Sequence, residues 1–258
     1  MREPIINIAI EAARAGAVLI MRAMKRMDMV KVSEKSPNDF VTEVDKRVEE
    51  EIIGVIKKAY PQHSILGEES GELEGNEYQW IIDPIDGTRN FIHGFPHFAI
   101  SIAVMHKNRI EYGVIYDPLR QELFTAIRGK GAHLNNQRIR VSTRKTLEHA
   151  LLATGFAYRH SDQEASLPDD SFKAILPICG DVRRAGAATL DLAYVACGRL
   201  DGYWEKGLHI WDIAAGILLV KEAGGMICDT KGGEDYLKSG NVVAANMNLV
   251  KQMIKVIK

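Results

Sequence analysis

The sequence has few cysteines, and their spacing excludes two kinds of site. Three occur in 258 residues, at positions 179, 197 and 228, and no two of them form a C-x-x-C pair. This number provides no disulfide framework, and the spacing provides no cysteine-based zinc site. We expect Cys197 and Cys228, which lie in apolar surroundings, to be buried thiols of a protein in the reducing cytoplasm.

The sequence also lacks an excess of charge of either sign. Its 33 Lys and Arg residues are balanced by 34 Asp and Glu residues, which gives a formal net charge of −1. No global basic field therefore attracts nucleic acid or an anionic membrane, and the sequence shows no RNA-binding module. A local basic patch is compatible with this balance.

Long uncharged apolar runs are absent as well. The nearest approach, residues 90–106, is interrupted by Gly94, Pro96 and three histidines, so we expect no membrane-spanning segment. The first apolar stretch contains Glu3 and Glu11 and no small-residue cleavage site, which argues against a signal peptide. With 46% hydrophobic residues, the chain can bury the core of one large domain or of two tightly joined lobes.

Hydrophobic periodicity predicts two amphipathic helices in the first sixty residues. Pro4 is suited to open the first helix, in which apolar residues recur at three- and four-residue steps. Thr42 and Asp45 match the T-x-x-D capping box at the start of the second helix, which Pro61 ends. This local pattern makes Asp45 a helix cap and directs Glu49 outward, together with the acids that follow it.

The chain changes character near residues 142–149. Before this point, short apolar segments separated by turns predict an antiparallel meander, with strands at 99–105, 110–116, 122–127 and 132–135. After it, strands alternate with helices. We therefore predict a single domain over residues 1–258, with an α+β lobe and its antiparallel sheet in 1–145 and an α/β lobe in 146–258. A polar loop at 159–170 is either a flap or an insertion.

The stretch 80–91 contains two carboxylates on a turn. Its first three residues form a short apolar strand that we expect to end at Asp83-Pro84, because proline has no N–H to continue a ladder. Asp83 and Asp86 can then converge on one point. Carboxylates this close require a cation or a proton, and oxygen ligands suit Mg²⁺, Mn²⁺ or Ca²⁺. An ordinary turn with solvated acids is the alternative.

Other residues occupy comparable positions at the ends of predicted elements. Glu68 follows the short strand 64–67, and Asp212 lies at the start of a long apolar helix. Gly186 precedes another helix and leaves free N–H groups for an anion, while Arg183 upstream adds positive charge. Taken singly, these are equally well explained as solvated turns, a helix cap and a surface arginine.

Two long motifs in the chain resemble the inositol monophosphatase family, and most closely its bacterial members of the SuhB type. They are Asp83-Pro-Ile-Asp-Gly-Thr88 and Trp211-Asp-Ile-Ala-Ala-Gly216. Shorter matches extend the resemblance over nearly the whole chain, at 38–45, 67–70, 116–118, 129–132, 190–196 and 222–225. The resemblance implies a fold with α+β and α/β features, the layered αβαβα sandwich that this family shares with fructose bisphosphatases.

The resemblance also implies which residues bind Mg²⁺. Glu68, Asp83 and the main-chain carbonyl of Ile85 would hold one ion. Asp83, Asp86 and Asp212 would hold a second, with Asp83 bridging the two, and Glu68 would help to hold a weaker third. Two or three Mg²⁺ ions per chain are therefore expected, with Li⁺ as an inhibitor and Ca²⁺ as another possible occupant.

The catalytic and substrate-binding residues follow from the same resemblance. Thr88 and Asp45 are expected to orient the attacking water, with Glu68 as a further catalytic residue, so that Asp45 would be more than a cap. Two positions depart from the family pattern: Ala187 stands where relatives often carry a hydroxyl residue, and Arg89 is expected to face solvent. The expected substrate contacts surround the metal ligands and the turn near residue 186: Glu68, Ile85, Asp86, Gly87, Thr88, Arg183, Gly186, Ala187, Ala188, Glu205 and Asp212.

The implied activity is hydrolysis of myo-inositol 1-phosphate by metal-activated water in a cytoplasmic homodimer. Fructose 1,6-bisphosphate, a 3′-phosphoadenosine nucleotide or another small phosphate ranks lower, since no insertion would build a nucleotide pocket. A different class of function is also open, because SuhB-type proteins are associated with RNA polymerase and antitermination in ribosomal RNA synthesis. In that case Arg183 and Arg184 would serve a protein surface.

Overall fold

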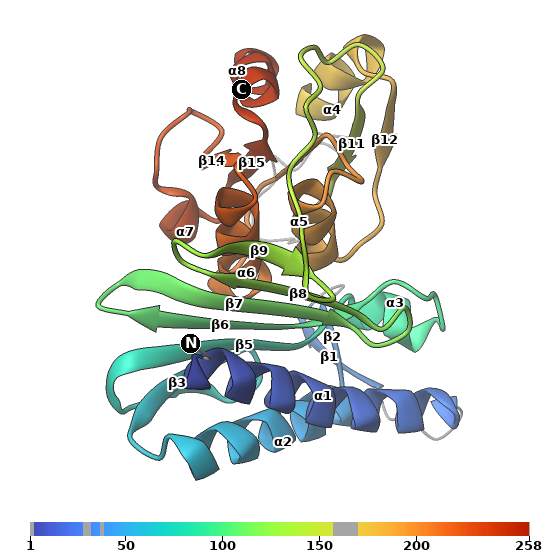
Figure 1. Cartoon of the computed structure of the whole chain (residues 1–258). Helices are drawn as coiled ribbons and strands as arrows, with labels where there is room; N and C mark the ends of the chain where they lie inside the picture. Colours follow the sequence, from blue (N-terminus) through green and yellow to red (C-terminus); the bar gives the residue numbers. More distant parts are fainter. Residues whose placement is uncertain (1–2, 28–31, 37–38, 157–169, 258) are drawn as a thin grey trace.

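The computed structural model describes residues 3–27, 32–36, 39–156 and 170–257. Five layers are stacked in it, in which three pairs of helices alternate with two sheets (Figure 1). This order confirms the predicted αβαβα sandwich. The pairs are α1 (Pro4–Met24) with α2 (Glu43–Ala59), α5 (Ala188–Ala196) with α6 (Ile210–Glu222), and α4 (Asp170–Ile175) with α8 (Met247–Val256).

The large sheet lies between the first two pairs of helices. Its strands are β3 (His63–Gly67), β4 (Gly71–Leu73), β5 (Asn76–Asp86), β6 (Ala99–His106), β7 (Arg109–Asp117), β8 (Glu122–Ile127), β9 (Gly131–Leu134) and β10 (Gln137–Arg138). They are arranged in the order β10-β9-β8-β7-β6-β5-β3-β4. From β5 to β10 the pairing is antiparallel, which confirms the meander, whereas β3 pairs with β5 in parallel. The sheet is therefore mixed.

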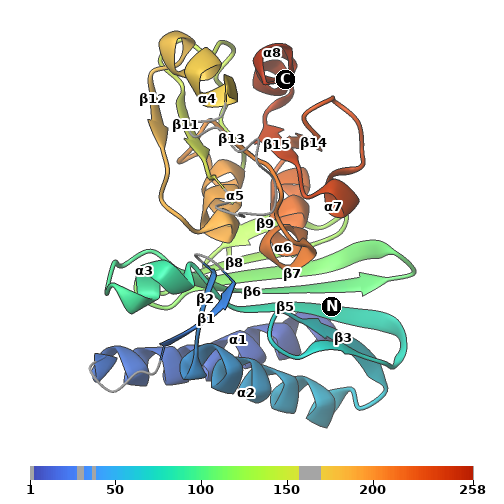
Figure 2. The same ribbon diagram turned by 180° about the vertical axis from the view of Figure 1, so that it is seen from behind.

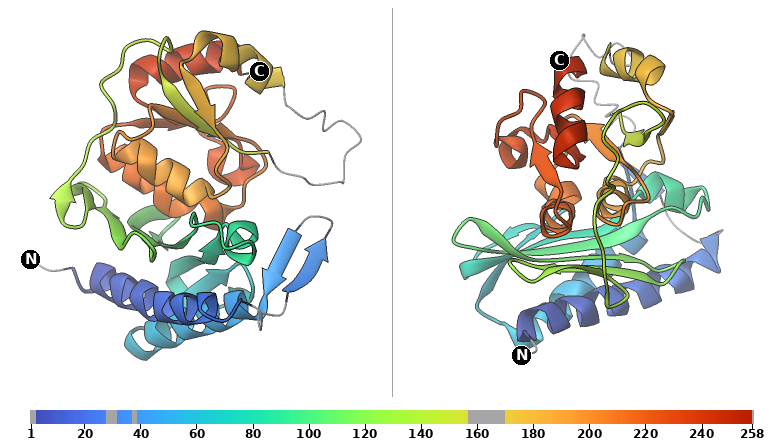
Figure 3. Two further views of the ribbon diagram at one scale, coloured as in Figure 1. Left: turned by 90° about the vertical axis from the view of Figure 1, so that its right-hand side faces the viewer. Right: turned by 45° about the horizontal axis from the view of Figure 1, so that its top comes forward.

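The small sheet lies between the second and third pairs of helices, as Figure 3 shows. Its strands are β11 (Leu151–Thr154), β12 (Asp181–Arg183), β13 (Gly202–Glu205), β14 (Met226–Cys228) and β15 (Val242–Ala245), in the order β12-β11-β13-β15-β14. β11 is parallel to both of its neighbours, and the other pairs are antiparallel. The strands of the large sheet precede residue 145 in the sequence, and those of the small sheet follow it. The division of the chain into two lobes stays a prediction.

Several short elements were not predicted from the sequence. One of them is a hairpin of β1 (Val32–Ser36) and β2 (Asp39–Thr42), which lies between the two predicted amphipathic helices. The short helices α3 (Thr88–Ile92) and α7 (Tyr236–Ser239) were also missed, because segments of four or five residues are too short to show a helical period. Apart from Asp170, the predicted polar loop at 159–170 lies outside the described residues.

Helix α1, and not residues 90–106, is the described segment that comes nearest to a membrane-spanning helix. By length and composition alone, it is long and apolar enough to cross a membrane. Its apolar side nevertheless packs in the core, where Ala12, Gly16 and Ile20 are buried against α2 and the large sheet (Figure 2). Core helices of soluble proteins pass the same test of length and composition, and the burial of this side explains why α1 is apolar.

Candidate active site

A bulge in β5 brings Asp83 and Asp86 to the same region. The strand does not end at Asp83-Pro84 as expected but continues to Asp86, with a register shift in its pairing with β6. Asp83 is opposite Ser101, and Asp86 is opposite Ala99, so the strand holds one extra residue here. A bulge accepts Pro84 because the extra residue needs no ladder bond. It also overrides the alternation that places residues three apart on opposite faces of a regular strand.

The parallel pairing of β3 with β5 places Glu68 beside Asp83. Gly67, the last residue of β3, pairs with Ile82 of β5, so Glu68 follows β3 at the level at which β5 continues into Asp83. The backbone N–H of Glu68 donates to the carbonyl of Ile82 at 3.1 Å. Glu49 stabilises the turn that follows Glu68, because its carboxylate accepts the N–H groups of Glu69 and Ser70 at 3.0 and 2.7 Å. Glu49 is only 1% exposed, so the prediction that it faces solvent is wrong.

The two central helices add the remaining acid and fix Asp86. Asp212 lies in the first turn of α6, as predicted, where its carboxylate accepts the N–H of His209 at 2.7 Å. Thr189, in the first turn of α5, donates its N–H and its hydroxyl to Asp86 Oδ2 at 2.7 and 2.5 Å. Asp86 therefore links the end of β5 to the start of α5, across the boundary between two layers.

Four carboxylates in this region repel one another. Burial raises the pKa of Asp83 well above its ordinary value, and the charges of Glu68, Asp86 and Asp212 and a hydrogen bond with Glu68 raise it further. Burial also raises the pKa of Asp86 to about 6, although the bonds from Thr189 oppose the shift. Burial and then the charge of Asp86 raise the pKa of Asp212 well above its usual range. The four acids thus share one electrostatic environment.

This set of donors fits a hard divalent cation. Carboxylate and carbonyl oxygens are the ligands of Mg²⁺ and Ca²⁺, and like charges this close call for a cation or for extra protons. Within the described part of the chain, no three acid, His or Cys side chains are grouped closely enough to form a finished ligand shell. Asp86 and Asp212 instead accept backbone N–H groups of Thr189 and His209. The mutual repulsion of the acids is therefore the observation that indicates a cation site.

Asp45 joins the start of α2 to the start of α3. The capping box is present: Asp45 Oδ2 accepts the N–H and the hydroxyl of Thr42 at 2.8 and 2.5 Å. The other oxygen accepts the hydroxyl of Thr88 at 2.9 Å, and the same hydroxyl lies 3.0 Å from the carbonyl oxygen of Ile85. Asp45 is therefore a cap and also a partner of Thr88. Burial raises its pKa, while the hydrogen bonds from Thr42 and Thr88 act against that shift.

A cavity of about 240 Å³ opens next to the acids. Among the expected substrate contacts, Arg183 does not line it; that side chain lies on β12 and pairs with Asp181 at 2.5 Å. Its neighbour Arg184 lines the cavity instead. Arg89, expected to face solvent, lines it as well. The described lining residues are Asp86, Arg89, Asn90, Gly155, Phe156, Arg184, Gly186, Ala187, Ala188, Glu205, Leu208 and Asp212.

Asn90 was not predicted as a site residue, because no local pattern marks it as one. Its side-chain amide donates to the carbonyls of His97, Ala185 and Gly186 at 2.7, 2.9 and 3.3 Å. It thereby ties the loop before α5 to the loop before β6. The contacts with Ala185 and Gly186 span 95 and 96 positions in sequence. Only its place inside a family motif could have drawn attention to it.

Five alternating layers, with acidic strand and helix ends meeting at one cavity, define a phosphatase fold. The model of the inositol monophosphatase family matches residues 1–257. The chain belongs to this family.

Known proteins of two kinds are similar to the chain. A protein of Pseudomonas aeruginosa named Nus factor SuhB is 51% identical, covering 99% of this chain and 96% of its own length. The crystal structure of the extragenic suppressor protein SuhB from Bartonella henselae is 40% identical, covers 99% of both chains and superposes with a TM-score of 0.94. An inositol monophosphatase from Anabaena is 38% identical, covers 97% of this chain and 93% of its own, and has a TM-score of 0.86.

Proposed function

We propose that the chain is a Mg²⁺-dependent phosphomonoesterase that hydrolyses myo-inositol 1-phosphate to inositol and phosphate. The observation that carries this proposal is the buried Asp83, whose pKa is raised by the charges of Glu68, Asp86 and Asp212, the last two of which line a cavity. Such a cluster is costly for folding unless it holds a cation. Membership of a phosphatase family makes phosphate ester hydrolysis the reaction to test first.

The metal ligands in this proposal are the carboxylates of Glu68, Asp83, Asp86 and Asp212 and the carbonyl of Ile85, which would hold two or three Mg²⁺ ions. Bound Mg²⁺ supplies a water of lowered pKa and neutralises charge on the phosphate. The fold contributes the positions of the ligands, since the bulge in β5 places Asp83 and Asp86 and the first turn of α6 places Asp212. The same oxygen donors would accept Ca²⁺.

Asp45 and Thr88 are proposed to hold the attacking water and to receive its proton. The hydroxyl of Thr88 has one hydrogen, which it donates to Asp45 or to the carbonyl of Ile85. Its lone pairs remain free to accept a hydrogen bond from water. The hydroxyl and N–H of Thr42 hold the second oxygen of Asp45, so the carboxylate cannot rotate away. Glu68, which forms a hydrogen bond with Asp83, would assist.

The cavity is proposed to hold the inositol ring. Gly186, Ala187 and Ala188 line one side of it, and α5 begins there without a side-chain cap. Their backbone N–H groups could bind phosphate or hydroxyl oxygens. Glu205, which accepts the hydroxyl of Tyr203 at 2.6 Å, would accept a ring hydroxyl. In this proposal Arg184, which lines the cavity, takes over the contact expected for Arg183.

The test is phosphate release from inositol 1-phosphate by the purified full-length chain, with Mg²⁺, with EDTA and with added Li⁺. We expect activity that needs Mg²⁺ and falls with Li⁺. Asp83→Asn should lower kcat by at least about 100-fold while its circular dichroism stays native. Asp181→Asn, an exposed control, should keep full activity. Near-normal turnover by Asp83→Asn would refute the ligand assignment, and fructose 1,6-bisphosphate or another sugar phosphate turned over faster would change the substrate.

A second candidate function is favoured by the names of relatives. Proteins about 50% identical to this chain are named Nus factor SuhB, which suggests an association with RNA polymerase and antitermination. We propose this role as an alternative or an addition to catalysis. Pull-down at low salt with purified polymerase and antitermination factors tests it, and failure to recover any of them would argue against it.

The remaining expectations are also proposals. A homodimer would appear in light scattering as twice the 28.7 kDa chain mass. Residence in the cytoplasm agrees with three cysteines that are all free thiols. Of the two expected to be buried, Cys228 is buried and Cys197 is partly exposed.

A further inference from the structure

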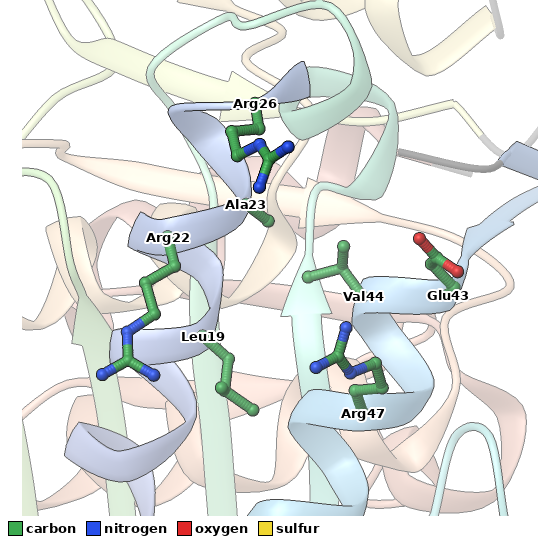
Figure 4. Close-up of a pocket in the computed structure, with 7 residues that line it drawn as sticks. All are labelled: Leu19, Arg22, Ala23, Arg26, Glu43, Val44 and Arg47. Carbon is green, nitrogen blue, oxygen red and sulfur yellow. The ribbon is translucent and has the colours of Figure 1, made fainter. Parts of the chain in front are cut away.

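A second cavity lies between α1 and α2, on the other side of the large sheet from α5 and α6 (Figures 1 and 4). Its volume is about 300 Å³, which is within the range of small-molecule pockets. Leu19, Ala23 and Val44 form its apolar wall. None of its lining residues lines the cavity beside Asp86 and Asp212, so the two sites are separate.

The polar part of this cavity is strongly basic. Arg22 projects from α1 and Arg26 from the turn that follows it, while Arg47 and Glu43 project from α2 (Figure 4). Three arginines against one glutamate leave two net positive charges, in a chain whose net charge is −1. Arg22 and Arg47 form no ion pair with any residue that the structure describes. Guanidinium groups bind anions through charge-assisted hydrogen bonds, and three of them line this one cavity.

The surroundings of the cavity restrict the size of that anion. The groove that continues along α1 and α2 shares Leu19 and Arg47 with the cavity, but beyond them it carries two acids, Glu50 and Glu51, against one further cation, Lys58. A long polyanion laid along the two helices would meet these two carboxylates, whereas a compact ligand would not. The backbone N–H groups of Val44 and Asp45 are already bound to Thr42, so the arginine side chains alone would hold the ligand.

We propose that this cavity binds a compact anion with at least two negative charges, such as a small bisphosphate. Arg22, Arg26 and Arg47 would contact its charged groups, and the apolar wall would contact a short carbon skeleton. Val44, which lines the cavity, is adjacent to Asp45 in the first turn of α2. An anion bound here would therefore rest on the same helical turn that positions Asp45 beside Thr88.

The test is calorimetric titration of the full-length protein with methylenebisphosphonate, a probe without a hydrolysable phosphate ester. Metal is removed with EDTA, and the EDTA is then dialysed away before the titration, because without metal the four carboxylates of the candidate active site repel anions and because EDTA is itself a compact anion. We expect saturable one-to-one binding that weakens at least about tenfold in Arg22→Gln/Arg47→Gln, since charge-assisted bonds are lost. Arg14→Gln, an exposed arginine of α1 outside the cavity, should bind as wild type. Asp83→Asn should also bind normally.

Thermal unfolding supplies a second readout. A ligand that binds only the folded protein raises Tm, so the probe should raise it in wild type and in Arg14→Gln but not in the double variant. Equal binding by wild type and the double variant, or no saturable binding, would overturn the proposal. An oligoribonucleotide that binds this face through Arg22 and Arg47 while the bisphosphonate does not would overturn it in favour of RNA. None of these outcomes depends on phosphatase activity.

Discussion

Asp83 is a buried residue whose negative charge opposes folding but suits the proposed metal site. It is 1% exposed and lies among three other acids, so the metal-free protein must hold mutually repelling carboxylates or take up protons. We expect Asp83→Asn to raise the stability of the protein in EDTA by on the order of 1 kcal/mol, because the amide removes a charge and keeps an oxygen for the N–H of Ile85. Calorimetric Tm in EDTA measures this effect.

The matched control for this prediction is Asp181, an exposed acid in a different setting. Its ion pair with Arg183 lowers its pKa, so neutralising it should leave Tm unchanged or lower it slightly. In saturating Mg²⁺ the order of wild type and Asp83→Asn should reverse, because wild type gains the binding free energy of the metal. A lower Tm for Asp83→Asn in EDTA would contradict a repulsive cluster.

His97 should make stability depend on pH. Burial and the charge of Arg120 lower its pKa to about 4, although Asp117 acts in the opposite direction, and its Nε2 has no hydrogen-bond partner among the described residues. Between pH 6.5 and 4 the unfolded chain therefore binds a proton that the folded chain does not. Stability must then fall as the pH is lowered through this window. The loss between pH 7 and pH 5 is about 2 kcal/mol.

Urea unfolding at several pH values measures this dependence. In His97→Gln the loss between pH 7 and pH 5 should be smaller by about that amount. His149→Gln, which changes an exposed histidine, should keep the slope of wild type. Equal slopes in wild type and His97→Gln would show that His97 is protonated in the folded protein.

At the residue scale, the sequence identifies acids better than the side chains that support them. Asp83 and Asp86 stand out because a motif surrounds them, and Asp45 was found because it matches a capping box. Glu49 and Asn90 lack any such signal, since all of their partners except the carbonyl of His97 are backbone groups 20 to 96 positions away. Long-range contacts of this kind depend on the packing of layers, which no local pattern encodes.

At the scale of elements, regular segments could be predicted from the sequence and irregular ones could not. The meander and the helices of two or more turns were found from their periods. The continuation of β5 through Pro84 was missed because proline normally ends a strand, and a bulge is recognised only when the partner strand is known. The irregularity coincides with the candidate site, since the bulge is what brings Asp83 and Asp86 together.

Gly87, which lies between the end of β5 and the start of α3, has no room for a side chain. Its φ is +91°, and a Cβ there would lie 3.0 Å from the carbonyl oxygen of His97 and 3.3 Å from that of Gly186. Gly87→Ala should therefore cost about 2–3 kcal/mol of stability, from backbone strain and crowding together. Gly94→Ala is the control, because Gly94 also has positive φ but no atom near its added Cβ. It should cost about 1 kcal/mol.

Activity separates the two glycine variants further. Gly87 lies between Asp86 and Thr88, so crowding there shifts both of these side chains. We expect a large loss of kcat in Gly87→Ala and little change in Gly94→Ala, measured under conditions where both are folded. Equal activity in the two variants would show that the turn can relax without moving the site.

At the scale of the whole molecule, the layers could be anticipated from the resemblance but their contacts could not. The pattern of helices and strands is compatible with several stacking orders, and the parallel insertion of β3 between β4 and β5 has no local signature. What fixes the stack is close packing between layers. Gly113 on β7 shows this, because a Cβ there would lie 3.0 Å from the carbonyl oxygen of Ala215 on α6.

The contact between α5 and α6 sets the distance between two parts of the site. Gly216 on α6 leaves room for Leu192 on α5, since an added Cβ would lie 2.5 Å from Leu192 Cδ1 and 2.6 Å from its Cβ. Gly216→Ala would force the helices apart. Because α5 carries Thr189, which holds Asp86, and α6 carries Asp212, the two acids would separate as well.

We therefore expect Gly216→Ala to lose about 1–3 kcal/mol of stability through overpacking and also to lose activity and Mg²⁺-induced stabilisation. Gly54→Ala on α2 is the opposite case, because no atom lies near its added Cβ and alanine favours a helix. It should gain up to about 1 kcal/mol and keep full activity. Urea unfolding with and without Mg²⁺ measures both effects. A Gly216→Ala protein that is destabilised yet gains as much from Mg²⁺ as wild type would show that the acids reach the metal independently of the packing between layers.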